Sequence, residues 1–297
     1  MSRQVGIPTI ALGAGFVIAW SCGFWGAKLG TGDASASTLL FWRFAVVAVI
    51  LWTFVGVRGL RIPRRELRHH VTVGLFAQAG YVAPVYAAVA LGVSTGTTSL
   101  VDAVQPIVVA TLAGPLLGLT VRPVQWSGLV AAFVGVLMIV RADALGGAGS
   151  WWVYLLPLLA VASLVVGTLV ERGHATTAPV PVMLAVHVSV STVVFLVPNL
   201  LSGDPVPQHG GFWAVVAFLA LVPTIAAYAL YWMLLRRVDV TSLNTLLLLV
   251  VPTTTLGGVV MFDEPLTPLT IVGVGVVAAG VVTVLRGERR PEPVPAA

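Results

Sequence analysis

Residues 123–141 read PVQWSGLVAAFVGVLMIVR, and residues 268–286 read PLTIVGVGVVAAGVVTVLR. Each stretch starts with proline, has glycine at its sixth and thirteenth positions, and ends with arginine, so the second repeats the first at an offset of 145 residues. An earlier proline, Pro106, has its counterpart in Pro252 at an offset of 146 residues. Because internal duplication of apolar segments is typical of membrane transporters, these stretches predict a chain built from two homologous halves.

The composition predicts a membrane protein. Of the 297 residues, 58% are apolar and 9% are charged, whereas soluble domains carry about 25% charged residues. So few charges would leave the surface of a soluble fold uncovered, and we expect the bilayer to be the solvent for most of the chain. Cys22 is the only cysteine, which rules out an intrachain disulfide and a multi-cysteine metal site. The first apolar run is long enough to span the bilayer, and no hydrophilic domain follows it, so we expect no cleavable signal peptide.

Charge-free runs separate the chain into ten predicted transmembrane helices. Strands of a membrane barrel alternate polar and apolar residues, whereas these runs are continuously apolar, so the predicted fold class is an all-α integral membrane protein. The predicted spans are residues 5–27, 36–57, 71–91, 95–117, 123–140, 151–171, 179–201, 210–234, 240–262 and 267–285.

The basic residues predict the orientation of these helices. If the N-terminus is inside, the cytoplasmic segments hold thirteen of the 16 Lys and Arg residues, as the positive-inside rule requires. These thirteen are Arg3, Arg58, Arg61, Arg64, Arg65, Arg68, Arg122, Arg172, Arg236, Arg237, Arg286, Arg289 and Arg290. Both termini are therefore predicted to be cytoplasmic, in a multi-pass protein of the plasma (inner) membrane.

Five spans in each half is an odd number, so the second half must cross the bilayer in the opposite direction to the first. We therefore predict two inverted five-helix repeats, residues 1–141 and 142–286, followed by a disordered cytoplasmic tail at 287–297. Substrate sites in such inverted repeats lie at the interface between the halves, near the membrane midplane.

Several short motifs resemble the EamA-type family of the drug/metabolite transporter superfamily. Residues 20–28 read WSCGFWGAK and residues 41–44 read FWRF, similar to the family's Trp-Gly…Lys and Arg-Phe. Residues 247–252 read LLLVVP and residues 263–267 read DEPLT, close to its apolar-Pro…Glu-x-Leu-Thr pattern. The resemblance covers essentially the whole chain and implies ten spans in two homologous halves and an exporter of small organic metabolites. One departure is Leu119, which stands in the first half where Glu264 stands in the second; we expect Glu264 to be a helix-terminal charge that faces water in a loop.

Three ionisable residues lie inside predicted spans, where a charge costs about 2.5–3.5 kcal/mol on insertion scales. They are Arg43, Asp102 and His187. Arg43 and Asp102 are candidates to hold the carboxylate and ammonium groups of a zwitterionic substrate; Asp102 is also a candidate for proton coupling, and a static ion pair is the structural alternative. His187, the repeat counterpart of Arg43, is a second candidate proton relay, since imidazole titrates near neutrality; ordinary helix packing is its alternative.

Polar and aromatic side chains form further candidate substrate contacts. Thr98, Asp102 and Gln105 fall on one helical face just before Pro106, and Asn244 is the repeat counterpart of Thr98; helix–helix hydrogen bonding is the alternative role of this face. The remaining candidates for the cavity wall, which combine apolar area with a polar group, are Trp20, Gln78, Tyr81 and Tyr228. Pro106 and Pro252 are candidate hinges, because proline removes a helical hydrogen bond; static kinks are the alternative.

These observations predict a secondary transporter that exports small organic metabolites such as amino acids by alternating access, with H⁺ as a possible coupling ion. No Gly-rich phosphate loop of the Walker type is present, and the sequence predicts no cofactor, no metal site and no nucleic-acid partner. A non-transporting membrane scaffold is one alternative. An intramembrane enzyme is another, disfavoured because no His-x-x-x-His motif or nucleophile–base pair is evident.

Overall fold

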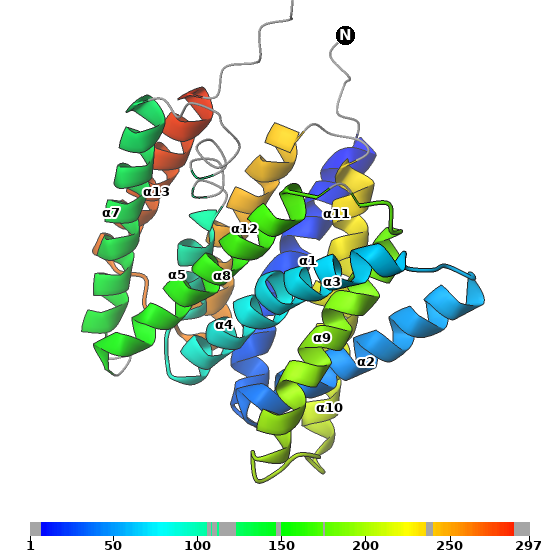
Figure 1. Cartoon of the computed structure of the whole chain (residues 1–297). Coiled ribbons are helices and arrows are strands. Elements are labelled where there is room, and N and C mark those ends of the chain that lie inside the picture. Colours follow the sequence, from blue (N-terminus) through cyan, green and yellow to red (C-terminus); the bar gives the residue numbers. More distant parts are fainter. Residues whose placement is uncertain are drawn as a thin grey trace, which may run out of the picture.

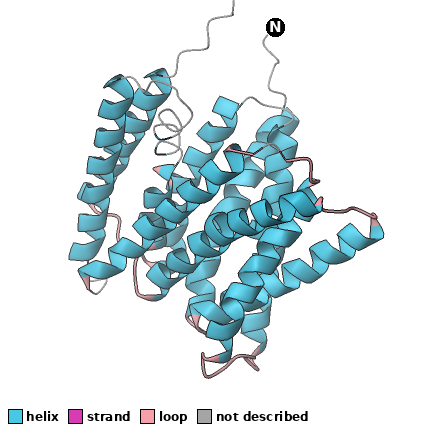
Figure 2. Cartoon of the chain, viewed as in Figure 1, coloured by secondary structure: helices cyan, strands magenta, loops and turns pink. Residues whose placement is uncertain are grey.

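The fold was obtained as a computed structural model, which describes residues 7–105, 108, 112, 123–146, 150–174, 176–235 and 240–287. Within these ranges all regular structure is helical (Figure 2). The first half contains α1 (Ile7–Thr31), α2 (Ala36–Val57), α3 (Arg64–Val73), η1 (Gly74–Ala79), α4 (Gly80–Ala90), α5 (Thr95–Asp102) and α7 (Pro123–Leu145). The second half contains η2 (Trp151–Tyr154), α8 (Leu155–Arg172), α9 (Val180–Leu200), α10 (Gly210–Leu219), η3 (Ala220–Ala226), α11 (Ala227–Leu235), α12 (Val240–Phe262) and α13 (Pro268–Gly287).

The predicted fold class is confirmed. Among the described residues, seven helices are long and apolar enough to cross a membrane, and two shorter apolar helices are Leu249–Phe262 and Pro268–Gly280. Parts of all ten predicted spans are helical; the span 95–117 is described to residue 105 and at residues 108 and 112. In Figure 1, α1 begins and α13 ends on the same upper side of the molecule, as an even number of crossings requires. The predicted tail falls outside the described residues from residue 288 onward.

The two repeated stretches quoted at the start pack directly against each other as α7 and α13 (Figure 1). A Cβ atom added to Gly135 would lie 2.8 Å from the Gly273 carbonyl oxygen, and one added to Gly280 would lie 2.6 Å from the Gly128 carbonyl oxygen. Low numbers in α7 thus meet high numbers in α13, so the two equivalent helices run antiparallel. The glycines allow this close backbone approach, as small residues do in membrane helix pairs.

Other equivalent helices also pair across the halves in opposite directions. In α2 and α9, Ser37 donates to the Pro198 carbonyl oxygen, whereas Trp52, further along α2, donates to Ser189, which lies earlier in α9. Helix α5 packs on α12 in the same way, since Thr95 lies against Gly258 and Gly96 against Thr255. This antiparallel pairing of equivalent helices is the arrangement expected for inverted repeats.

The remaining spans exchange partners between the halves. Helix α1 packs against α10, η3 and α11, and α8 packs against α3, η1 and α4. Since α8 is the repeat counterpart of α1, and η3 is the counterpart of η1, these two contacts are related by the same pseudo-two-fold operation. Each half therefore contributes helices to both sides of a central space.

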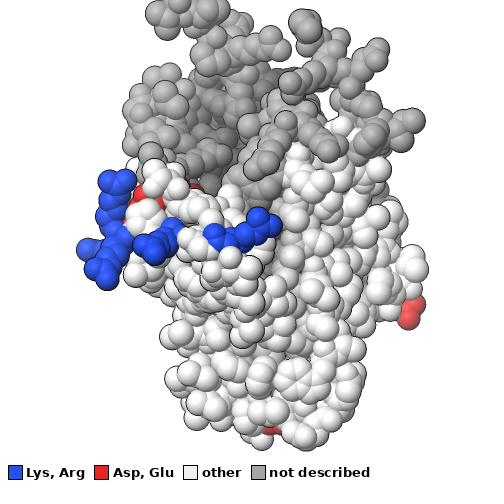
Figure 3. All heavy atoms as spheres, turned by 90° about the vertical axis from the view of Figure 1, so that its right-hand side faces the viewer, with Lys and Arg blue, Asp and Glu red and all other residues white. Residues whose placement is uncertain are grey.

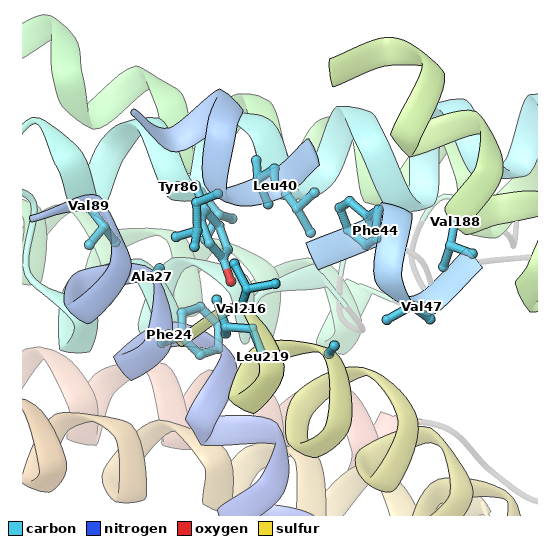
Figure 4. Packing of buried hydrophobic residues seen from close by; sticks show 14 of the residues in the cluster. Phe24, Ala27, Leu40, Phe44, Val47, Tyr86, Val89, Val188, Val216 and Leu219 are labelled. Atoms are coloured by element: carbon cyan, nitrogen blue, oxygen red, sulfur yellow. The ribbon is translucent and has the colours of Figure 1, made fainter. Parts of the chain in front are cut away.

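A large hydrophobic core joins the two halves. Its buried side chains come from α1, α2, η1, α4, α8, α9, α10, η3, α11 and α12. Figure 4 shows part of this core, including Phe24, Ala27, Leu40, Phe44, Val47, Tyr86, Val89, Val188, Val216 and Leu219.

Two π-helical segments interrupt equivalent spans. Segment η1 begins at Gly74 and η3 begins at Ala220, an offset of 146 residues, which is the offset of Pro106 and Pro252. Pro223 lies inside η3, where its missing N–H breaks the regular hydrogen-bond ladder. A π segment departs from the regular α-helical hydrogen-bond pattern, and such segments are frequent at functional sites. The equivalent positions of η1 and η3 therefore make both segments candidate parts of a functional site.

The charged surface is uneven. Figure 3 draws the face that lies on the right-hand side of Figure 1. Lys and Arg side chains gather there at one level, above a broad, mostly uncharged surface. The exposed basic residues of the α2–α3 region are Arg58, Arg61, Arg64, Arg65 and Arg68. An uncharged belt beside a basic edge is the surface expected of a membrane protein with one basic side.

Candidate functional site

A cavity of about 190 Å³ lies between the two halves. Seven of the sequence-predicted site residues line it: Trp20, Arg43, Gln78, Tyr81, Asp102, Gln105 and Tyr228. They come from α1, α2, η1, α4, α5 and α11, and Gln105 follows α5. The two π segments border it, η1 through Gln78 and η3 through Pro223.

Arg43 provides the positive charge at this cavity and is 6% exposed. Its Nε donates to Thr224 Oγ1 over 3.0 Å, and its Nη1 donates to the Tyr86 hydroxyl. Its guanidinium carbon also lies 5.2 Å from the centroid of the Phe44 ring. Tyr86 in turn donates to the carbonyl oxygen of Gly23 over 3.3 Å. Arg43 is therefore held by neutral partners, with guanidinium N–H groups left to bind an anion.

Asp102 provides the negative charge at the cavity, as the last residue of α5. The Tyr81 hydroxyl donates to Asp102 Oδ2 over 2.9 Å, whereas Oδ1 is buried without a hydrogen-bond partner among the described residues. Both Arg43 and Asp102 are described, and no ion pair joins them. An unpaired carboxylate oxygen in a buried site is costly, so Oδ1 is positioned to accept a proton or a donor group of a ligand.

Aromatic and amide groups complete the wall. The rings of Trp20 and Tyr228 are tilted against each other with centroids 5.6 Å apart. Gln105 Nε2 donates to Thr168 Oγ1 over 3.2 Å, which ties the end of α5 to α8. Gln78, the repeat counterpart of Thr224, is buried at the cavity wall. The wall thus combines apolar area with a few oriented polar groups, as small-molecule sites do.

Two other predicted site residues, Thr98 and His187, do not line the cavity. Thr98 is buried, and its hydroxyl donates to the Ser94 carbonyl oxygen over 2.9 Å. The ring centroid of His187 lies 5.7 Å from that of His70. The side chain of Asn244 and the whole of Pro106 lie outside the described residues. Pro252 lies within the continuous helix α12.

Among the lining residues that carry a polar group, Tyr86 and Ser99 were not predicted from the sequence. Tyr86 is the residue to which Arg43 Nη1 donates. Ser99 lines the cavity three residues before Asp102. The i, i+3 relation of Ser99 and Asp102 was the available signal, because residues three and four apart share a helix face.

The expectation that Glu264 faces water was wrong. Glu264 is 8% exposed, and its carboxylate accepts the backbone N–H and the hydroxyl of Thr95, each over 2.8 Å, and the Gly96 N–H over 3.3 Å. Lys28 Nζ lies 3.8 Å away. Glu264 follows Asp263, whose φ is 53°. It satisfies the free N–H groups at the start of α5, where negative charge is favourable.

Comparisons with known proteins agree with this architecture. The profile described as "EamA-like transporter family" matches residues 7–141 and 150–286. The "Uncharacterized inner membrane transporter YedA" of Escherichia coli (strain K12) is 26% identical over 277 residues, covering 91% of this chain and 88% of that protein. A solved crystal structure superposes with a TM-score of 0.65 at 20% identity, covering 95% of this chain and 99% of that one, which supports the fold alone.

Two further relatives have names that state a cargo. The "Probable amino-acid metabolite efflux pump" of Salmonella typhimurium is 25% identical over 291 residues, covering 94% of each chain. The "Probable terminal-alkyne amino-acid exporter" of Streptantibioticus cattleyicolor is 28% identical over 296 residues, covering 94% of this chain and 95% of that protein.

Proposed function

The chain belongs to the EamA-like transporter family, and from that premise we propose that it exports small zwitterionic metabolites such as amino acids across the membrane. The family is one of transporters and not of enzymes. The names of two relatives support a cargo of the amino-acid class and outward transport.

One observation carries the proposal: Arg43 and Asp102 line the same cavity from different helices, and neither is paired with the other. The guanidinium of Arg43 is suited to a carboxylate, which it recognises with two N–H groups. Asp102 Oδ1, buried without a partner among the described residues, is suited to an ammonium group. A zwitterion could thus interact with both Arg43 and Asp102 at once.

The size of the cavity supports a small cargo. At about 190 Å³ it falls below the roughly 300–1,000 Å³ of pockets that hold drug-sized ligands. The tilted pair Trp20 and Tyr228 offers apolar area beside the charged groups. A compact metabolite with one apolar part fits this wall better than a large drug.

Proton coupling through Asp102 is the second part of the proposal. Asp102 lines the cavity, and one of its carboxylate oxygens has no partner among the described residues, so the carboxylate can take up a proton when the cargo leaves. Exchange of H⁺ for cargo at one carboxylate couples the two movements without a second site. In this scheme His187 packs against His70 and takes no part in coupling.

We place alternating access in the elements that surround the cavity. The π segments η1 and η3 border it at equivalent positions, and local changes between π and α hydrogen bonding let a helix bend there. Pro106 and Pro252 are further candidate hinges. Glu264 joins the α12–α13 loop of the second half to α5 of the first.

The proposed location is the plasma (inner) membrane with both termini cytoplasmic, as the basic residues indicate. Single cysteines placed in a Cys22→Ser background test this orientation. Arg61→Cys lies at an exposed site of the basic α2–α3 loop, and Asp204→Cys lies at an exposed site after α9. In intact cells an impermeant thiol reagent should label position 204 and spare position 61; the opposite pattern contradicts the proposed orientation.

The transport proposal is tested in liposomes that contain the purified protein. Labelled amino acids loaded inside should exchange with unlabelled amino acids outside, and a pH gradient should drive net movement. If a correctly folded protein moves no solute in either assay, the alternative of a non-transporting scaffold replaces the proposal.

A further inference from the structure

Four of the five histidines of the chain gather in one cluster where α3, α8 and α9 meet. His69 and His70 lie on α3, His187 on α9, and His174 just after α8. The ring centroid of His69 is 4.7 Å from that of His174, and the centroid of His70 is 5.7 Å from that of His187. The sequence predicted no metal site, because His69 and His70 lie about a hundred residues before His174 and His187 along the chain.

Three ligand-type atoms of this cluster face one another. His69, His70 and Glu171 each offer one atom, and these atoms lie within 4.8 Å of each other. His69 Nε2 is already 3.0 Å from Glu171 Oε2. The ligand atoms of a tetrahedral Zn²⁺ site lie about 3.4 Å apart, so a side-chain movement of roughly an ångström closes the site.

His70 is the second, independent sign of a ligand. It is 0% exposed, and neither of its ring nitrogens has a hydrogen-bond partner among the described residues. The nearest carboxylate, that of Glu66, has an oxygen 3.9 Å from Nε2 but is occupied by the N–H groups of Thr177 and Ala178. A buried imidazole without hydrogen-bond partners is costly, and a bound ion is one species that would satisfy it.

We propose that His69, His70 and Glu171 form a binding site for a divalent transition-metal ion of the Zn²⁺ class. Two imidazoles and one carboxylate are a ligand set that Zn²⁺ accepts, with a fourth position for water or another side chain. Hard oxygen-seeking cations such as Mg²⁺ and Ca²⁺ are disfavoured by the imidazoles. His174, exposed beside His69, is placed to supply the fourth ligand.

The bound ion would connect the two halves. His70 belongs to the first half and Glu171 to the second, and α3 packs against α8. Gly74, which begins η1 four residues after His70, lies against the backbone of His187. An ion at this site would hold the start of η1 and stabilise the folded state by linkage. This inference rests on the cluster alone and is independent of the cargo.

Metal binding by the full chain in detergent, purified without a polyhistidine tag, tests the site. We expect equilibrium dialysis to find one Zn²⁺ per chain, a rise in the thermal midpoint with Zn²⁺ but not Mg²⁺, and a visible absorption band of tetrahedral type with Co²⁺. Absence of bound Zn²⁺ at about 100 µM free metal would overturn the proposal, because a site that is empty at this concentration would not stabilise the protein.

Variants locate the ion. His69→Gln and Glu171→Gln, which keep side-chain size, should each weaken Zn²⁺ binding at least about tenfold. The matched control is His209→Gln, at the fifth histidine, which is exposed and lies 4.0 Å from Asp33 instead of in the cluster. Wild-type affinity in both cluster variants, or loss only in the control, would overturn the assignment. If the cluster variants fail to fold, the Co²⁺ spectrum of the wild-type protein decides: a band typical of imidazole and carboxylate ligands supports the site, and no band contradicts it.

Discussion

The Tyr81 hydroxyl donates to Oδ2 of Asp102 over 2.9 Å, which fixes one side of the carboxylate and leaves the other oxygen buried without a partner among the described residues. The two residues come from α4 and α5, so this contact also sets the position of α5 at the cavity. A carboxylate held in this way keeps one oxygen free to accept a proton or a donor group. Asp102 lines the same cavity as Arg43.

Asp102→Asn should abolish the response of transport to a pH gradient. The amide does not exchange a proton but still accepts a hydrogen bond, so solute exchange at equal pH should persist with weaker affinity. The measurement is gradient-driven flux and exchange in liposomes. Asp143→Asn is the matched control. Asp143 accepts the Ser94 N–H, with a donor–acceptor distance of 3.1 Å, and does not line the cavity. An unchanged pH response in Asp102→Asn would remove Asp102 as the coupling site.

Arg43→Gln should lower cargo affinity at least about tenfold, equivalent to about 1.4 kcal/mol. Arg43→Lys should recover only part of this loss, because lysine keeps the charge but loses the planar fork that holds Thr224, Tyr86 and a carboxylate together. Binding of a labelled amino acid to the detergent-solubilised protein measures the effect. Arg58→Gln, at an exposed arginine, is the control; equal affinity in all three variants would argue against a carboxylate site at Arg43.

Gly135→Ala should destabilise the protein by about 1–3 kcal/mol. The added Cβ would meet the Gly273 carbonyl oxygen and the Val277 backbone nitrogen, each at 2.8 Å, and backbone atoms do not yield easily. Gly275→Ala, in the partner helix α13, is the control because nothing lies within 4 Å of its added Cβ. Thermal unfolding in detergent should show a lower midpoint for the first variant only. Equal midpoints would mean that α7 and α13 are not in this close contact.

Glu264→Gln should lower the thermal midpoint and the rate of transport. The amide replaces an acceptor oxygen with a donor that faces the N–H groups of Thr95 and Gly96 and removes the charge near Lys28, at a cost of about 1–3 kcal/mol. The neighbouring change Asp263→Asn is the control, because Asp263 is exposed and asparagine tolerates its positive φ. Equal effects of the two substitutions would show that the buried contacts of Glu264 are unimportant.

Much of the fold was predictable because the repeat and the bilayer constrain it. The stretches 123–141 and 268–286 predicted equivalent helices, and the structure pairs them as α7 and α13. The sequence did not predict that these two helices contact each other, because an offset gives equivalence and not position. It also did not predict η1 and η3, since a π segment depends on how neighbouring helices satisfy its backbone.

The site was predictable in part for a similar reason. An ionisable residue in an apolar span is expected to face the protein interior, and Arg43 and Asp102 both line one cavity. This expectation failed to separate the cavity from other interior positions, so His187 was grouped with them although it packs on His70. The hydrogen-bond partners of Arg43 and Asp102 lie on other helices, and pairing across helices is not encoded in local spacing.

The central claim is that Arg43 and Asp102 hold the two charged ends of one cargo, and competition in liposomes tests it most directly. An amino acid, its methyl ester and its N-acetyl derivative are compared as inhibitors of labelled amino-acid exchange by the wild-type protein and Arg43→Gln. The account predicts that only the free amino acid inhibits the wild-type protein strongly and that Arg43→Gln reduces its advantage over the ester. Equal inhibition of the wild-type protein by all three compounds would contradict the account.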